Sequence, residues 1–216
     1  MRKLLRIHKG QKGITGLETA IILIAFEVVA AVFAYTVLSA GLFSTQKSQE
    51  AVYSGLKEAR STMELKGGVI ATSQTTGANG TIKQVTFTVS NALNGEAIDF
   101  TAPLTTGSNG VAPAASNNKV VISYIDEDQA VDDLFWTVTK LGKDDGDDLL
   151  ENSEKFQITI GASANGTAGG GNLIDALGTD LTVNKTFTIE VKPPIGAVLA
   201  IERTTPAYID TVINLN

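Results

Sequence analysis

The longest pattern in the sequence is an apolar run near its N-terminus. From Ala20 to Phe43 the only charged residue is Glu27. Between Thr19 and Lys66 there is no proline, and glycine occurs only at positions 41 and 55. The pattern allows one helix of nearly 50 residues from Thr19 to about Lys66, roughly 75 Å long at 1.5 Å per residue, and we assign 14–68 to this helical segment. Its apolar half is long enough to cross about 30 Å of hydrocarbon.

The second half of this predicted helix changes character. Val52, Leu56, Ala59 and Met63 recur at helical spacing, with charged residues between them. The pair Gly67-Gly68 then predicts the end of the helix. An apolar stripe that continues beyond the membrane-spanning length indicates contact with another protein surface.

From Val69 the apolar positions alternate with polar ones. In the segment 81–90, Val85, Phe87 and Val89 share one face and threonines share the other. Similar runs occur at 119–125, 134–140, 155–160, 181–191, 197–202 and 208–215, separated by stretches rich in glycine and asparagine. The fold class predicted is α+β: a long N-terminal hydrophobic helix followed by an antiparallel, immunoglobulin-like β-sandwich over 69–216. The strand connectivity stays open.

Composition excludes several kinds of chemistry. The 216 residues contain no cysteine, which excludes disulfides, thiol nucleophiles and cysteine-ligated zinc. The one histidine, His8, lies in the N-terminal tip, so no Ser-His-Asp triad is expected in the body of the chain. The glycine-rich loops lack the Lys-Ser/Thr of a phosphate-binding loop. We therefore expect no enzymatic activity.

Charge separates the N-terminal tip from the remainder. The first 13 residues hold five basic side chains and no acid, which leaves 12 basic and 23 acidic residues from Ile14 onward, a charge of −11. So acidic a chain is not expected to bind nucleic acid. The apolar run is too long for a secretory signal, and no small-residue cleavage site ends it. A cut between Gly13 and Ile14 would instead remove the basic tip and keep the helix, with Glu18 as the fifth mature residue.

These residues together resemble the archaeal flagellins (archaellins), relatives of type IV pilins. The likeness is carried by a basic residue and Gly13 before the cut, by Gly16 and Glu18 after it, by the long apolar run, and by the C-terminal segment PPIGAVLAIERTTPAYIDTVINLN. The resemblance implies a 1–13 leader removed by a prepilin-type peptidase, a filament core formed by helices over 14–68, and an outer β-domain. It also implies the motor and platform proteins of the archaellum as partners.

Gly16, Glu18 and Glu27 are the candidate assembly residues. The resemblance implies that Glu18 pairs with the terminal amine of Ile14 in a neighbouring subunit. A carboxylate favoured by the dipole of the helix N-terminus is the alternative. Glu27 is either a tolerated substitution or a contact that sets the register of packed helices, because a carboxylate in an apolar setting must be protonated or paired.

Acidic residues gather in the middle of the outer domain, where ten of the 23 acids lie between Asp126 and Glu151. Oxygen-rich loops suit calcium or another divalent cation. The EF-hand spacing is missing, and a solvated acidic loop or, less favoured, a glycosidase carboxylate pair are the alternatives. The candidate ligands are Asp126, Asp128, Asp144, Asp145, Asp147 and Asp148.

Three Asn-x-Ser/Thr sequons, at Asn79, Asn165 and Asn184, are candidate N-glycosylation sites. Asn79 and Asn165 fall in predicted loops and Asn184 in a predicted strand. The function predicted is a structural, extracellular filament subunit for swimming, made of copies of this chain with or without other archaellins. Its precursor would insert transiently in the cytoplasmic membrane, basic end inside. The alternatives are an adhesive archaeal pilin and, less favoured, a membrane-anchored enzyme or binding domain.

Overall fold

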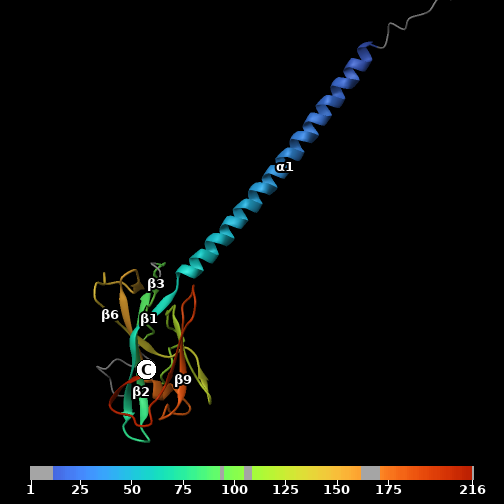
Figure 1. Ribbon diagram of the computed structural model, residues 1–216. Helices are drawn as coiled ribbons and strands as arrows, with labels where there is room; N and C mark the ends of the chain where they lie inside the picture. Colours follow the sequence, from blue (N-terminus) through green and yellow to red (C-terminus); the bar gives the residue numbers. More distant parts are fainter. Residues whose placement is uncertain (1–11, 93–94, 105–108, 162–170, 216) are drawn as a thin grey trace, which may run out of the picture. The chain divides into compact units, whose positions relative to one another are not determined.

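The computed structural model describes residues 12–92, 95–104, 109–161 and 171–215. The chain divides into two compact units, residues 1–54 and 55–216. Helix α1, Lys12–Arg60, supplies the described part of the first unit and begins the second (Figure 1). The other elements belong to the second unit, which we call the outer domain.

Helix α1 is exposed along its length. From Leu17 to Tyr53 every described large apolar side chain is between 56% and 75% exposed. Residues 16–59 contain a helical segment that by length and composition could cross a membrane. The helix follows from an apolar, proline-free sequence in which each backbone N–H can bond to the carbonyl four residues before it.

The helix ends at Arg60, eight residues before the predicted end. The hydroxyl of Ser61 donates a hydrogen bond to the Lys57 carbonyl at 3.0 Å, and that of Thr62 to the Ala59 carbonyl at 2.9 Å. The Lys57 carbonyl also accepts the backbone N–H of Ser61 at 3.0 Å, so side-chain hydroxyl groups add to the bonding of carbonyls in the last helical turn. Met63 is the first residue of strand β1 and lies 4% exposed in the core of the outer domain.

Gly67 and Gly68, which were predicted to end the helix, lie inside β1. The register of β1 against β2 shifts between Lys66 and Ile70. Lys66 pairs with Thr88 and Ile70 with Thr86, so a step of four residues on β1 corresponds to a step of two on β2. Gly67 has φ +80°, a conformation that suits glycine in a bulge. Gly68 lies so close to the side chain of Asn214 that a Cβ there would come within 2.6 Å of its amide oxygen.

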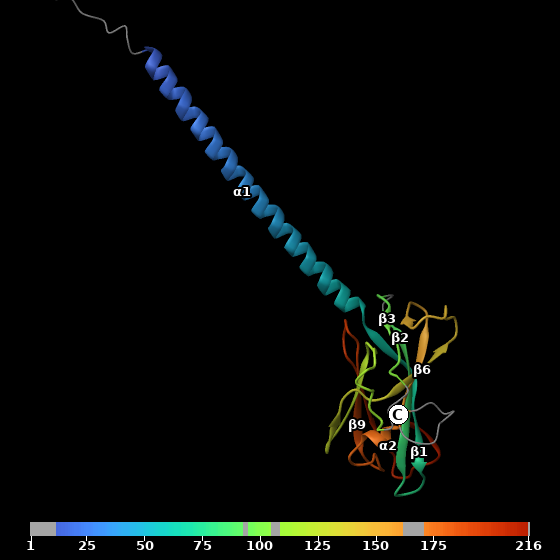
Figure 2. The same cartoon turned by 180° about the vertical axis from the view of Figure 1, so that it is seen from behind.

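The outer domain contains two antiparallel sheets, which confirms the predicted fold class of a long helix followed by antiparallel β-sheets. The first sheet has the order β11-β1-β2-β8-β6, with bounds Val212–Leu215, Met63–Thr75, Thr81–Asn91, Lys155–Ile160 and Trp136–Leu141. The second has the order β10-β9-β4-β5, with bounds Leu199–Thr204, Thr186–Lys192, Val121–Asp126 and Ala130–Val131. A short pair, β3 (Ile98–Asp99) and β7 (Leu149–Leu150), and helix α2 (Leu173–Ala176) complete the described elements. Figure 2 labels β1 and β9 on opposite sides of the domain.

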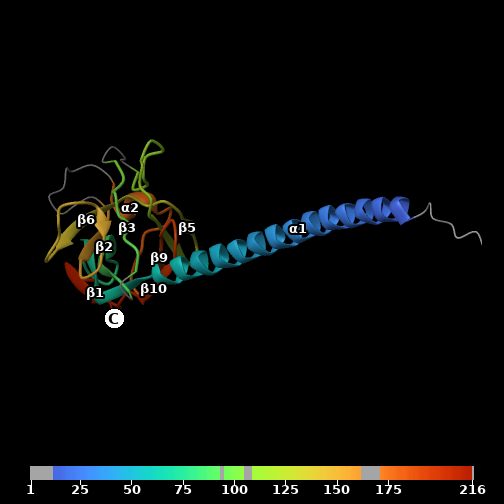
Figure 3. The ribbon, with the colours of Figure 1, turned by 90° about the horizontal axis from the view of Figure 1, so that it is seen from above.

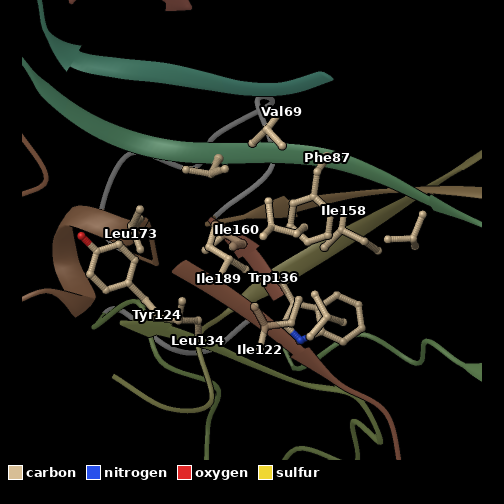
Figure 4. Close-up of a cluster of buried hydrophobic side chains, with 14 of the residues drawn as sticks. Val69, Phe87, Ile122, Tyr124, Leu134, Trp136, Ile158, Ile160, Leu173 and Ile189 are labelled. Atoms are coloured by element: carbon tan, nitrogen blue, oxygen red, sulfur yellow. The ribbon is translucent and has the colours of Figure 1, made fainter. Parts of the chain in front are cut away.

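The core lies between the two sheets. Phe87, Ile158 and Trp136 of the first sheet and Ile122 and Ile189 of the second are at most 1% exposed (Figure 4). The predicted apolar face of 81–90 is confirmed, since Val85, Phe87 and Val89 are all buried. The core cluster draws all its members from residues 63–215, so the outer domain has a hydrophobic core of its own.

Two predicted strands are shorter than expected. The run 181–191 forms strand only from Thr186, because Asn184 has a left-handed φ of 55° that turns the chain before β9. The run 208–215 forms strand only from Val212, since Ile209 pairs instead with Gly77 in an isolated bridge. The first strand is thus limited by a local turn, and the second by a contact with a distant part of the chain.

Candidate functional site

The candidate assembly residues lie on the exposed helix. Gly13 and Ile14 lie in the first turn of α1, where backbone N–H groups have no partner inside the helix. Glu18 and Glu27 are exposed. Nothing lies within 4 Å of the Cβ position at Gly16. Glycine at such a position allows a second helix to approach closely.

The last turn of α1 and the start of β1 are held within the outer domain by several contacts. Lys57 forms an ion pair with Glu96 at 3.1 Å. The Ala92 N–H donates to the Thr62 carbonyl at 2.8 Å. Gly196, in the loop between β9 and β10, has φ +111°, and a Cβ there would overlap the carbonyl oxygen of Ser61. The chain therefore leaves the helix through a tightly packed junction, a feature that no sequence motif indicated.

The described sequons lie in exposed turns. Asn79 is exposed in the turn between β1 and β2. Asn184 is also exposed, but in a turn, so its predicted place within a strand is wrong. The backbone N–H of Asn184 donates to the Pro206 carbonyl at 3.3 Å. Asn165 lies outside the described residues.

The two acidic loops belong to different sheets. Asp126 and Asp128 lie at the turn between β4 and β5, whereas Asp144, Asp145, Asp147 and Asp148 follow β6. Figure 3 labels β5 and β6 on opposite sides of the domain. The structure therefore does not bring the six predicted ligands together.

In the turn after β4, Asp126 already has protein partners. Its carboxylate accepts hydrogen bonds from Tyr124 Oη at 2.7 Å and from the backbone N–H groups of Asp128 and Gln129 at 2.8 Å each. Partial burial acts to raise the pKa of Asp126, but these hydrogen bonds outweigh it and hold the pKa below its usual value. Asp128 pairs with Lys185 at 2.7 Å. This turn is organised by its own side chains.

Replacing Asp126 with asparagine should therefore change the acid sensitivity of the fold. Because the folded-state pKa is lowered, the carboxylate contributes stability above its unfolded pKa of about 3.9, and this is lost as pH falls through the folded value. We expect Asp126→Asn to lower the free energy of unfolding by about 1–3 kcal/mol at pH 7, with the difference from the native chain shrinking near pH 3. Denaturant unfolding at both pH values checks this, and an equal loss at the two would contradict it. Glu127→Gln, at an exposed neighbour, is the control.

The loop after β6 contains a closer group of acids. Among the described residues, the one group of three or more metal-ligating side chains is Asp144, Asp145 and Glu154, with ligand oxygens all within 4.8 Å of one another. Glu154 was not a predicted ligand, yet it is only 7% exposed. One oxygen of each carboxylate accepts a backbone N–H, from Gly146, Asp147 and Glu151 respectively. The Asp147 carboxylate accepts a hydrogen bond from the Leu149 N–H, and Asp148 forms an ion pair with Lys140.

Known proteins similar to the chain include several archaeal flagellins. The family model for archaeal-type flagellin matches residues 13–203. A probable flagellin of Archaeoglobus fulgidus is 39% identical, with 98% of each chain covered. One of Aeropyrum pernix is 32% identical, covering 93% of this chain and 95% of the relative.

Solved structures agree. The archaeal flagellum of Methanospirillum hungatei matches with a TM-score of 0.62 and 28% identity, covering 93% of this chain and 98% of that one. A crystal structure of an archaeal flagellin from Methanocaldococcus jannaschii covers 71% of this chain with a TM-score of 0.51 and 13% identity, a likeness of fold alone. With a family match over most of its length, a curated relative at 39% identity and the same long helix followed by antiparallel sheets, the chain belongs to the archaeal-type flagellin family.

Proposed function

We propose that this chain is a structural subunit of an archaellum filament, the extracellular filament used for swimming. The observation that carries the proposal is the helix 16–54, whose apolar side chains are exposed throughout. In a family of flagellins, helices of neighbouring copies would cover them. The matched family and relatives are flagellins, so the adhesive pilin gains no support from them. A structural role also leaves a membrane-anchored enzyme without support.

Assembly begins with the precursor in the cytoplasmic membrane. The apolar helix holds it there with the basic residues on the cytoplasmic side. A prepilin-type peptidase cuts after Gly13, and the helices exchange lipid contacts for contacts with one another. The motor and platform proteins of the archaellum act on the growing filament. Each contact between unlike surfaces of two copies extends an open helix.

The experiment that tests this uses filaments sheared from cells that make the chain. Electron microscopy should show filaments, and mass spectrometry of their subunits should find Ile14 as the first residue. The same peptide maps report glycans at Asn79, Asn165 and Asn184, where we propose that an N-linked oligosaccharide is attached; Asn79 and Asn184 are exposed. Cells that accumulate the processed chain as dispersed subunits would refute the filament proposal, whereas three unmodified sequons would refute only the glycan.

Glu18 and Glu27 should respond differently to neutralisation. We propose that Glu18 pairs with the amine of Ile14 on a neighbouring copy, an attraction of about 4 kcal/mol at 4 Å and an effective dielectric of 20. Glu18→Gln should therefore reduce the number of filaments at least tenfold while processing continues. Glu27→Gln should leave filaments intact if Glu27 is tolerated, and should impair them if it pairs between helices. Filament counts by electron microscopy separate these outcomes, and normal assembly of Glu18→Gln would contradict the pairing.

A divalent cation is proposed at Asp144, Asp145 and Glu154. Three carboxylates within 4.8 Å repel one another unless a cation or proton intervenes, and the oxygen-only ligand set suits calcium. At a calcium concentration 100 times the Kd, binding would stabilise the fold by about 2.7 kcal/mol, a rise in Tm of about 5–10 °C for a domain of this size. Chelation should reverse the rise, and Asp145→Asn should abolish it, while Glu127→Gln should not. An unchanged Tm across a calcium titration would contradict the site.

A further inference from the structure

The loop that joins β9 to β10 consists only of apolar residues. Residues 193–198 have the sequence PPIGAV, and we call them the apolar loop. Ile195 is 45% exposed and Val198 is 51% exposed, and Pro194 and Ala197 are exposed as well. Among the described residues, every other loop of the outer domain includes at least one polar or charged side chain. Composition and exposure together therefore distinguish this loop from the rest of the domain surface.

The apolar loop lies at the end of the outer domain where the chain leaves α1 (Figure 1). Gly196 packs against Ser61, which directly follows the last turn of α1, and a Cβ at Gly196 would overlap the Ser61 carbonyl oxygen. Leu56, in the part of α1 that belongs to the outer domain, adds an apolar side chain that is 51% exposed. Two prolines restrict the loop and Gly196 anchors it, so a contact made by the loop orders little additional chain.

An exposed run of consecutive apolar residues indicates a surface that another molecule covers. A membrane would be one such cover, because α1 includes a segment long and apolar enough to span one. The apolar run of α1 ends at Phe43, however, and α1 continues for 17 residues to Arg60, which is roughly 25 Å of helix. A bilayer around that run therefore ends well before the end of α1, beside which the apolar loop lies.

A second copy of the chain supplies a matching surface on the apolar part of α1, residues 20–43. Glu27 is the one charged residue in this part, and its large apolar side chains are at least 56% exposed. Copies in an open helical assembly are displaced along its axis, and helices that cover one another must overlap lengthwise. Because α1 has 49 residues, about 74 Å, the end of one α1 comes beside an earlier part of α1 in a neighbouring copy.

We propose that the apolar loop is a docking surface for the apolar part of α1 of a second copy in the filament. The contact removes both apolar surfaces from water, and the loop has no charged or polar side chain whose burial would oppose it. It adds to the contacts between helices a contact from the outer domain of one subunit to the helix of another. This inference rests on the proposed filament function, because a single copy has no second α1 to offer.

Cysteine labelling in the full chain tests whether a second copy covers the loop. Because the chain has no cysteine of its own, Ile195→Cys places a single thiol there. Tyr208→Cys is the control: Tyr208 is 57% exposed in another loop, next to Ile209, which pairs with Gly77 beyond the far end of β1. A charged maleimide is applied to membranes of cells in which assembly is blocked, to sheared filaments and to filaments dissociated in detergent. A packed interface excludes the reagent, so Ile195→Cys should react at least about tenfold more slowly in filaments than in the other two samples, and Tyr208→Cys alike in all three.

Disulfide cross-linking identifies what covers the loop. Ile195→Cys is combined, one variant at a time, with a cysteine at each exposed apolar position from 21 to 43, and each variant is made together with the native chain so that filaments still form. A disulfide requires Cβ atoms about 3.5–4.5 Å apart. After mild oxidation of filaments, mass spectrometry should find the peptide containing residue 195 joined to α1 of another copy, at positions three or four residues apart on one helix face. Tyr208→Cys combined with the same positions should give no link from residue 208.

Three results would overturn the proposal. Equal labelling of Ile195→Cys in filaments and dissociated subunits means that no copy covers the loop. Protection that is already complete in membranes before assembly means that lipid covers it instead. Protection in filaments without any link to α1 means that a different surface of the neighbour lies there. If Tyr208→Cys is equally protected, filaments exclude the reagent generally and the cross-link alone decides. None of these results affects the filament function, which fails only if the native chain makes no filaments.

Discussion

Replacing Phe33 with aspartate should abolish filaments while leaving the outer domain folded. Phe33 is 69% exposed in the middle of the apolar part of α1, where neighbouring helices are proposed to cover it. A carboxylate at the centre of an apolar helix costs about 2.5–3.5 kcal/mol on insertion scales, and the cost recurs in every subunit. We expect fewer than about one filament in a hundred relative to the native chain, since each 1.4 kcal/mol corresponds to a factor of ten.

Electron microscopy of sheared cell surfaces measures this loss. Gln46→Asp is the control, because it adds the same charge to the same helix at an exposed position beyond the apolar run. Near-ultraviolet circular dichroism reports whether the core around Trp136 stays packed, since the hydrophobic core contains only residues of the outer domain. Normal filament numbers in Phe33→Asp would show that position 33 stays accessible to solvent after assembly.

The pattern of apolar and polar residues predicted most of the fold. The long apolar run predicted the helix α1, and the alternation of apolar and polar residues predicted the strands β2 and β8. The helix end was wrong for a different reason. Residues 61–66 fit a helix by pattern, but Met63 is drawn into the core and pairs with Asn91. Tertiary packing overrides local preference at such a boundary.

The sites were harder to predict because they depend on which loops meet. Glu154 joins Asp144 and Asp145 through the folding of the loop between β6 and β8, and only its place as the last acid before a strand hints at this. The first sheet also places β1 beside β11, although these strands lie at opposite ends of the outer domain's sequence. Alternation shows that Thr86 points outward, but not that Thr159 and Thr137 lie beside it.

The junction between helix and sandwich offers the most demanding test of the packing. Gly196 has φ +111° and contacts the backbone of Ser61, whereas Gly146 has φ +102° and open space around its Cβ position. An alanine at either position should cost about 1–3 kcal/mol in backbone strain. Gly196→Ala must in addition push the loop away from Ser61, and we expect it to lower the free energy of unfolding by at least about 2 kcal/mol more than Gly146→Ala.

Gly196→Ala should also change local hydrogen exchange, because Ser61 directly follows the last turn of α1. Ser61 bonds the Lys57 carbonyl, and Thr62 accepts the Ala92 N–H that starts the pairing of β1 with β2. Loss of the Gly196 contact should therefore speed hydrogen exchange at Ser61 and Ala92 before the core around Trp136 opens. Denaturant unfolding and exchange of the two variants measure both effects. Equal stability of Gly196→Ala and Gly146→Ala would mean that the loop has room for a methyl group beside the backbone of Ser61.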